Sequence, residues 1–169
     1  KGSAEVTKRR GNCQYTGTGL KKLDKWIGKT QWDVIHFNWG LWDIYGWGYA
    51  KIDRSPLVYE DRLNQLLVRL KKTGATLIWC TTTPVCPEAE KGMKTKFKTK
   101  VIITAEVQKQ YRDAALRVMK KHKVEINDLY SFIAPQRKKY ATGDDNVHYT
   151  KEGYKKLGEQ VAKAIKRSL

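Results

Sequence analysis

An aspartate and a histidine lie three residues apart near the end of the chain. Asp145 and His148 occupy a loop that leads directly into a predicted helix, which begins at Thr150. A neutral imidazole that acts as a general base needs a carboxylate to fix its tautomer and to stabilise the imidazolium that forms. The spacing offers both groups within one turn. A plain loop histidine beside a Thr150 helix cap explains these residues equally well.

The elements that must position this pair alternate between strands and helices. Buried parallel strands are predicted where apolar and β-branched residues cluster, at residues 32–38, 75–83 and 124–128, with a further short strand at 4–8. Helices are predicted from capping residues and apolar stripes, at residues 19–26, 55–73, 104–122, 129–138 and 150–167. Strands that alternate with helices favour right-handed crossovers and a parallel sheet covered on both faces. The predicted fold is therefore a three-layer α/β/α sandwich.

Length and composition predict a single domain over residues 1–169. The chain is 40% hydrophobic, with six tryptophans and nine tyrosines, and no linker-like stretch divides it. It lacks a run of about 18 apolar residues, so no membrane span is expected. Its three cysteines lack metal-ligand spacing, and Cys80 lies in an apolar run that is expected in the core. We expect no metal and no cofactor.

The charge balance predicts an anionic partner. The chain carries 34 Lys and Arg against 17 Asp and Glu, a formal net charge of +17. Most lysines fall on polar faces of predicted helices, but those at residues 91–100 alternate with Thr and Phe, as in an edge-protecting loop or an anion-binding surface. No recognised nucleic-acid motif is present, so nucleic acid is not the expected partner. A non-catalytic basic module that binds anionic glycan or nucleic acid is the alternative to an enzyme.

Two residues near predicted strand ends could form an oxyanion hole. Ligands gather at the carboxyl ends of parallel strands, where Gly11 and Asn38 are expected. The backbone N–H of Gly11 and the side-chain amide of Asn38 could donate to one reacting oxygen. A turn glycine and a strand-end amide bonded to backbone are the structural alternatives. Just beyond Asn38, the aromatic residues of segment 39–49, Trp39 and Trp42 among them, could stack on a sugar or pack against the body.

Three separated motifs resemble the SGNH (GDSL-type) esterase superfamily. They are GNCQYT at 11–16, DVIHFNWGLWD at 33–43 and DNVH at 145–148, and they occur in the order of that family. The resemblance implies a flavodoxin-like SGNH hydrolase fold, with Gly11 in the oxyanion hole. It also implies that Asp145 and His148 belong to a Ser-His-Asp triad.

The chain departs from the family pattern in two places. Trp42 stands where the family carries an oxyanion asparagine, and Asn38 is the expected substitute. The block with the nucleophilic serine is missing, because Ser3 precedes the first predicted strand and does not follow it. We therefore expect the N-terminal strand and the serine on a complementary polypeptide, with proteolysis or loss of this segment as the alternatives. The chain starts at Lys1 without a methionine, which leaves the compartment open, with secretion or the periplasm compatible.

The resemblance implies a serine esterase that hydrolyses an O-acyl ester, with acetyl as the expected group. Aromatic side chains near the pocket would suit a carbohydrate, and the lysines would attract an acylated anionic polysaccharide. Without the serine, the hole and the base could at best bind an ester or weakly activate water.

Overall fold

The computed structural model describes residues 4–8, 11–45, 52–86, 88–89 and 103–169. Its sheet has three parallel strands in the order β1-β2-β3, namely β1 (Val34–Phe37), β2 (Thr76–Cys80) and β3 (Glu125–Asn127). Val34 lies opposite Thr76, and Cys80 lies opposite Asn127. The three central strands predicted from the sequence are confirmed, each shorter than expected.

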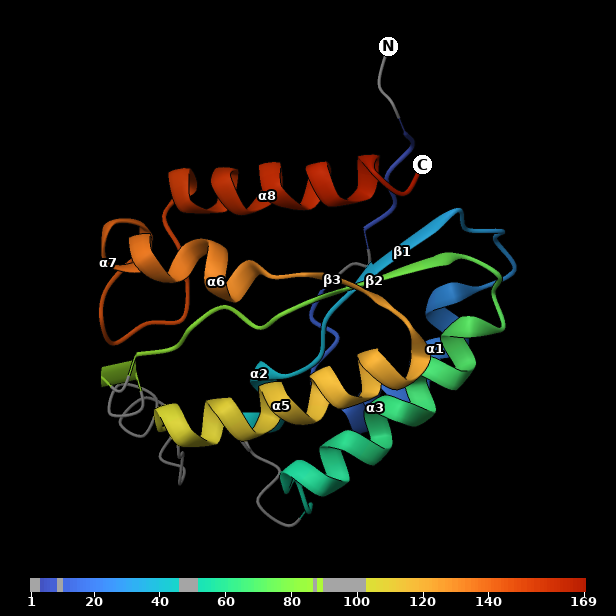
Figure 1. Cartoon of the computed structure of the whole chain (residues 1–169), viewed down its shortest axis with the longest axis horizontal. Coiled ribbons are helices and arrows are strands. Elements are labelled where there is room, and N and C mark those ends of the chain that lie inside the picture. Colours follow the sequence, from blue (N-terminus) through green and yellow to red (C-terminus); the bar gives the residue numbers. More distant parts are fainter. Residues whose placement is uncertain (1–3, 9–10, 46–51, 87, 90–102) are drawn as a thin grey trace.

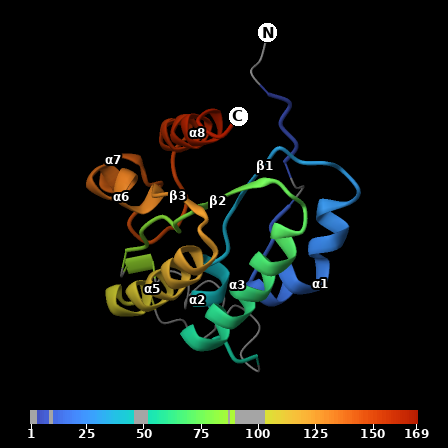
Figure 2. The same cartoon turned by 45° about the vertical axis from the view of Figure 1, so that its right-hand side comes forward.

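Helices cover both faces of this sheet (Figure 1). One face carries α1 (Thr16–Ile27), α2 (Leu41–Tyr45), α3 (Pro56–Lys71) and α5 (Ala105–His122). The other carries α6 (Leu129–Ile133), the 3₁₀ turn η1 (Ala134–Gln136), α7 (Arg137–Tyr140) and α8 (Lys151–Lys166). Figure 2 shows the same three layers from a second direction. The predicted α/β/α sandwich is confirmed.

Local capping explains where the long helices begin. Ser55, Thr104 and Thr150 each accept a backbone N–H from the residue three positions further on, at the starts of α3, α5 and α8. Gly28, with φ of +63°, ends α1 in a conformation that favours glycine. The helix predicted at 129–138 is divided into α6, η1 and α7, because Pro135 cannot donate the backbone bond that a continuous helix needs.

The main core lies between the sheet and the α1, α3 and α5 layer. Its centre is the predicted leucine stripe of α3, whose members are at most 1% exposed: Leu63, Leu66, Leu67 and Leu70. A second cluster under α8 contains Cys80 and Leu157, which confirms that Cys80 is a core residue. Along the described ranges, no helix combines the length and apolar character that crossing a bilayer requires.

Two elements differ from the prediction. Residues 4–8 form no strand: all five are exposed and pair with no other strand, and an isolated segment has no partner for its backbone groups. Part of the aromatic segment, predicted as loop, is the short helix α2, whose first turn bonds to the carbonyl of Gly40. Trp47, Tyr49 and the lysine-rich residues 91–100 lie outside the described residues.

Candidate active site

Asn38 joins the carboxyl ends of β1 and β2. Its amide Nδ2 donates to the Cys80 carbonyl at 2.6 Å and to Thr82 Oγ1 at 3.3 Å. These two bonds engage both amide protons, so the side chain bonds across the strand ends as the structural alternative expects. A role for Asn38 in an oxyanion hole stays a prediction, and it requires Nδ2 to exchange one of these partners for the reacting oxygen.

Gly40 allows this junction to close. A Cβ at Gly40 would lie 2.3 Å from Thr82 Oγ1, so no larger residue fits while Thr82 stays in place. Behind Gly40 and Thr82 lies a cavity of about 20 Å³, which Trp79 and Tyr130 also line. That volume suits a single water molecule and excludes an ester substrate.

Asp43, the last residue of the second motif, is buried between α2 and α1. It is 1% exposed, and its carboxylate accepts the Thr16 backbone N–H at 3.1 Å and Thr16 Oγ1 at 2.6 Å. Asp43 therefore caps α1 from 27 residues away, where the positive end of the helix dipole favours a carboxylate. Burial raises the pKa of Asp43 to about 6, although the Thr16 bonds and Arg54 oppose the rise.

Asp43 should make folding less favourable as pH rises from about 4 to about 6. Its pKa is higher in the folded than in the unfolded chain, so the folded state holds the extra proton in this window. The contribution amounts to about 2–3 kcal/mol of unfolding free energy, present near pH 4 and lost above pH 6. Urea unfolding at several pH values measures it as the difference between the native chain and Asp43→Asn. Burial lowers the pKa of His36 and gives an opposite trend, but both proteins share it. Parallel pH curves would contradict the assignment.

The loop that carries His148 is held on both sides of that residue. Asn146 Oδ1 accepts the backbone N–H groups of Val147 at 2.8 Å and His148 at 3.1 Å. The His148 carbonyl accepts the Thr142 N–H at 3.0 Å and Thr142 Oγ1 at 3.2 Å. An antiparallel bridge between Ala141 and Tyr149 closes the loop. His148 thus sits on a fixed backbone with an exposed side chain.

Arg137 ties this loop to the segment that follows β2. It is 7% exposed and donates from Nη2 to the Asn146 carbonyl at 2.9 Å and from Nε to the Pro84 carbonyl at 3.2 Å. Asp144 Oδ1 lies 3.9 Å from Arg137 Nη1. Contacts therefore run from the strand-end segment through Arg137 to the His148 loop. Nothing in the sequence separated Arg137 from the lysines beside it.

The His148 ring contacts a tyrosine. Nδ1 lies 3.0 Å from the Tyr154 hydroxyl oxygen. The exposed Asp145 carboxylate lies toward Gly143, whose added Cβ would be 3.0 Å from Asp145 Oδ1, and no hydrogen bond joins it to the ring in the described chain. Sequence reasoning missed Tyr154, although its place one turn into α8 was a usable signal. Asp145 as the orienting carboxylate stays a prediction.

The other predicted site residues, Gly11, Trp39 and Trp42, have different environments. Gly11 occupies an exposed turn with φ of +73°, a backbone conformation that favours glycine. Trp39 is 4% exposed and packs in the core, 5.9 Å from the Phe37 ring and against Gly19, so its indole cannot stack on a sugar. Trp42 is half-buried on α2, and its carbonyl accepts Arg54 Nη1 at 3.0 Å.

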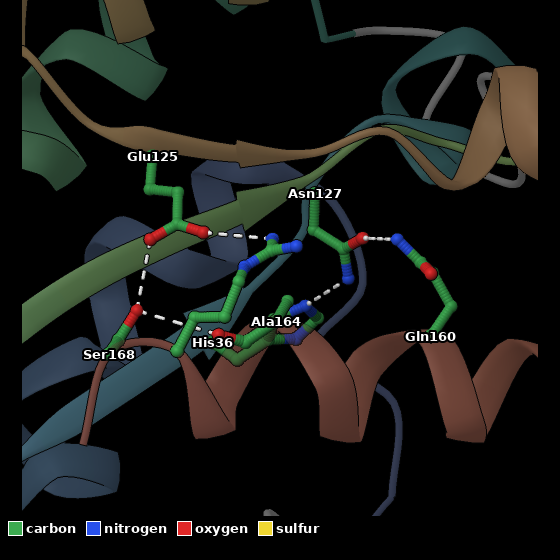
Figure 3. Close-up of polar contacts among 7 residues, drawn as sticks. His36, Glu125, Asn127, Gln160, Ala164 and Ser168 are labelled. Carbon is green, nitrogen blue, oxygen red and sulfur yellow. Dashed lines mark hydrogen bonds and ion pairs between the residues drawn. The ribbon is translucent and has the colours of Figure 1, made fainter.

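A second histidine, that of the motif at 33–43, has a structural role under α8 (Figure 3). His36 Nε2 lies 3.2 Å from Asn127 Nδ2, and Asn127 Oδ1 accepts Gln160 Nε2 at 3.2 Å. At the end of α8, Ser168 Oγ donates to Glu125 at 2.9 Å. These bonds attach α8 to the sheet across β3 and β1.

The described residues hold neither a nucleophile beside His148 nor a metal site. No Ser, Thr or Cys side chain in these ranges bonds to the His148 ring, and Ser3 lies outside them. Within the same ranges, no group of three or more His, Cys, Asp or Glu side chains could hold a metal ion.

One protein-family model matches most of the chain. The model of the GDSL-like Lipase/Acylhydrolase family matches residues 7–161. A search of curated proteins finds no match.

Solved structures share the fold at low sequence identity. The lipase/acylhydrolase from Enterococcus faecalis is 19% identical, with a TM-score of 0.66 over 90% of this chain and 71% of its own. A putative GDSL-like lipase from Parabacteroides merdae is 15% identical, with a TM-score of 0.72 over 89% and 68%. An acetyl xylan esterase is 12% identical, with a TM-score of 0.68 over 90% and 76%.

Proposed function

The chain belongs to the GDSL-like lipase/acylhydrolase family, and on this premise we propose that it supplies the acid–base part of a serine esterase. The observation that carries the proposal is the placement of His148. Its backbone is bonded on both sides, and its exposed ring makes one hydrogen bond, through Nδ1, within the described chain. Nε2 is thereby left for a substrate-side proton. A general base needs this combination of fixed position and free nitrogen.

In the proposed reaction, a serine hydroxyl attacks the ester carbonyl while His148 Nε2 removes its proton. The tetrahedral oxyanion takes hydrogen bonds from the Gly11 N–H and, after Nδ2 changes partner, from Asn38. His148 then returns the proton to the departing alcohol, and the acyl group stays on the serine. Water, activated by the same nitrogen, releases the acid. Asp145 stabilises the imidazolium when its carboxylate turns toward the ring.

The serine is proposed to come from polypeptide outside these 169 residues. β1 supports this, because it pairs with β2 along one edge and has no strand neighbour on the other within the described chain. An open parallel edge can accept a further strand through backbone hydrogen bonds. A nucleophile-bearing strand that added there would end on the side of the sheet where Asn38 lies.

The proposed substrate is an O-acetyl ester on a carbohydrate, with an acylated anionic polysaccharide as the best fit to the charge. The net charge of +17 supports an anionic polymer, and the half-buried Trp42 is the proposed sugar contact. One structure with this fold is an acetyl xylan esterase, so the fold can support such a reaction.

Hydrolysis of an aryl acetate tests the esterase assignment. We expect no serine-dependent turnover from the 169-residue chain alone, and turnover once a segment with a strand and a Gly-Asp-Ser nucleophile is joined ahead of it or added as a separate polypeptide. The matched control carries Gly-Asp-Ala in the same segment. Equal rates with the two segments would overturn the proposal, and salt-sensitive glycan binding without turnover would favour the binding-module alternative.

A further inference from the structure

We propose that Tyr154 is a positioning residue for His148. Its hydroxyl oxygen holds the imidazole at Nδ1 and so directs the Nε2 lone pair outward. The inference rests on the proposed role of His148 as general base, but the contact itself is a property of the folded chain, with Nδ1 and the tyrosine oxygen 3.0 Å apart. The carboxylate expected to perform this task, Asp145, makes no bond to the ring in the described chain.

Packing fixes where the Tyr154 hydroxyl lies. Tyr154 is 51% exposed, but its ring meets the buried Tyr149 ring edge to face, with centroids 6.1 Å apart and planes at 71°. The first turn of α8 is seated on Tyr140, because a Cβ at Gly153 would lie 2.9 Å from Tyr140 Cβ and from its carbonyl oxygen. Thr150 caps the same turn. The phenol therefore projects from a helix turn that is packed against the body of the protein, and not from a loose loop.

The same contacts hold the histidine relative to the phenol. Tyr149 adjoins His148 in the chain, and the Thr150 N–H donates to the Tyr140 carbonyl at 2.8 Å. The His148 carbonyl is bonded to Thr142, as described above. Both partners of the Nδ1 contact are thus anchored to the segment around Tyr140, which accounts for a side-chain hydrogen bond between two exposed residues.

The role of a general base selects one of the two tautomers that this contact allows. A tyrosine hydroxyl can donate to Nδ1 or accept from Nδ1–H. A base that works through Nε2 must carry its proton on Nδ1, so the productive arrangement has Tyr154 accepting. A neutral phenol fixes the tautomer and the ring direction but stabilises an imidazolium less than a carboxylate does. Tyr154 therefore fixes the tautomer and the direction of the ring, and the role left to Asp145 is to stabilise the charge of the imidazolium.

Nitrogen-15 NMR of the imidazole rings in the whole chain tests this role. The chain has three histidines, so His148→Gln identifies the His148 signals by loss. At a pH where the ring is neutral, we expect native His148 to be protonated on Nδ1. Tyr154→Phe should lose this preference and give a mixture of tautomers, whereas Asp145→Asn should keep it. An unchanged tautomer in Tyr154→Phe would overturn the proposal, as would loss of the preference in Asp145→Asn alone.

Steady-state kinetics separate failure of the positioning role from failure of the proposed esterase function. In the reconstituted esterase, Tyr154→Phe should lower kcat by about 10-fold with KM unchanged, as expected for misorientation of a base. Retention of full kcat despite a changed tautomer would overturn the positioning role. Absence of esterase activity in the native protein would instead remove the proposed function, and the NMR result would still report on the contact.

Discussion

Replacement of His148 by alanine is expected to lower kcat/KM of the reconstituted esterase by about 10²–10⁴-fold. This range is the usual loss when a positioned general base is removed. The side chain is exposed, so the variant should fold and unfold as the native protein does. The loss should therefore appear in turnover of an aryl acetate and not in the urea midpoint.

His122→Ala is the matched control. His122 lies at the end of α5, and its Nε2 is 2.9 Å from Asn64 Oδ1, so it belongs to the packing of α5 against α3. It should keep the native kcat/KM within about twofold, because no step of the proposed reaction uses it. Equal losses in the two variants would indicate a general structural effect, and an unchanged rate in His148→Ala would remove this residue from the mechanism.

Replacement of Arg137 by methionine should cost about 3 kcal/mol of unfolding free energy. The change keeps an apolar stem but removes charged donors from the Pro84 and Asn146 carbonyls, each bond being worth about 1.5–3 kcal/mol. Urea unfolding measures the loss. Amide hydrogen exchange should also become faster at His148, since the loop is no longer tied to Pro84.

Lys138→Met provides the control for Arg137, since the neighbouring lysine is exposed in the same helix. It should change stability by less than about 0.5 kcal/mol. A similarly small effect for Arg137→Met would show that water satisfies both carbonyls. Arg137 would then not be what holds the His148 loop against the segment at Pro84.

The central elements could be predicted because their signals are local. Ser55, Thr104 and Thr150 are capping residues that lie immediately before the helices they start. The start of α1 could not be predicted in this way. Its cap is Asp43, 27 residues further along the chain, so the helix begins at Thr16 and not at the predicted Gly19. Residues 4–8 show the converse, because a strand-like sequence forms no strand without a partner.

The candidate site was predictable in its loops but not in its contacts. The spacing of Asp145 and His148 located a loop before α8 correctly, whereas side-chain geometry places Tyr154 on Nδ1. Trp39 follows a strand end, as a ligand-stacking residue could. Its indole instead packs into the core, because Gly19 opposite it has no side chain and leaves room for the ring. Such packing depends on residues from separate elements, which spacing within one segment does not encode.

Covalent labelling with a fluorophosphonate ester tests whether the nucleophilic serine lies outside these 169 residues and depends on His148. The reagent forms a stable adduct on an activated serine, and mass spectrometry of the protein isolated from its natural source locates that residue. We expect one labelled serine, in polypeptide outside these 169 residues, with the labelling lost in His148→Ala. A label on a residue within the 169, or labelling that His148→Ala leaves unchanged, would contradict it.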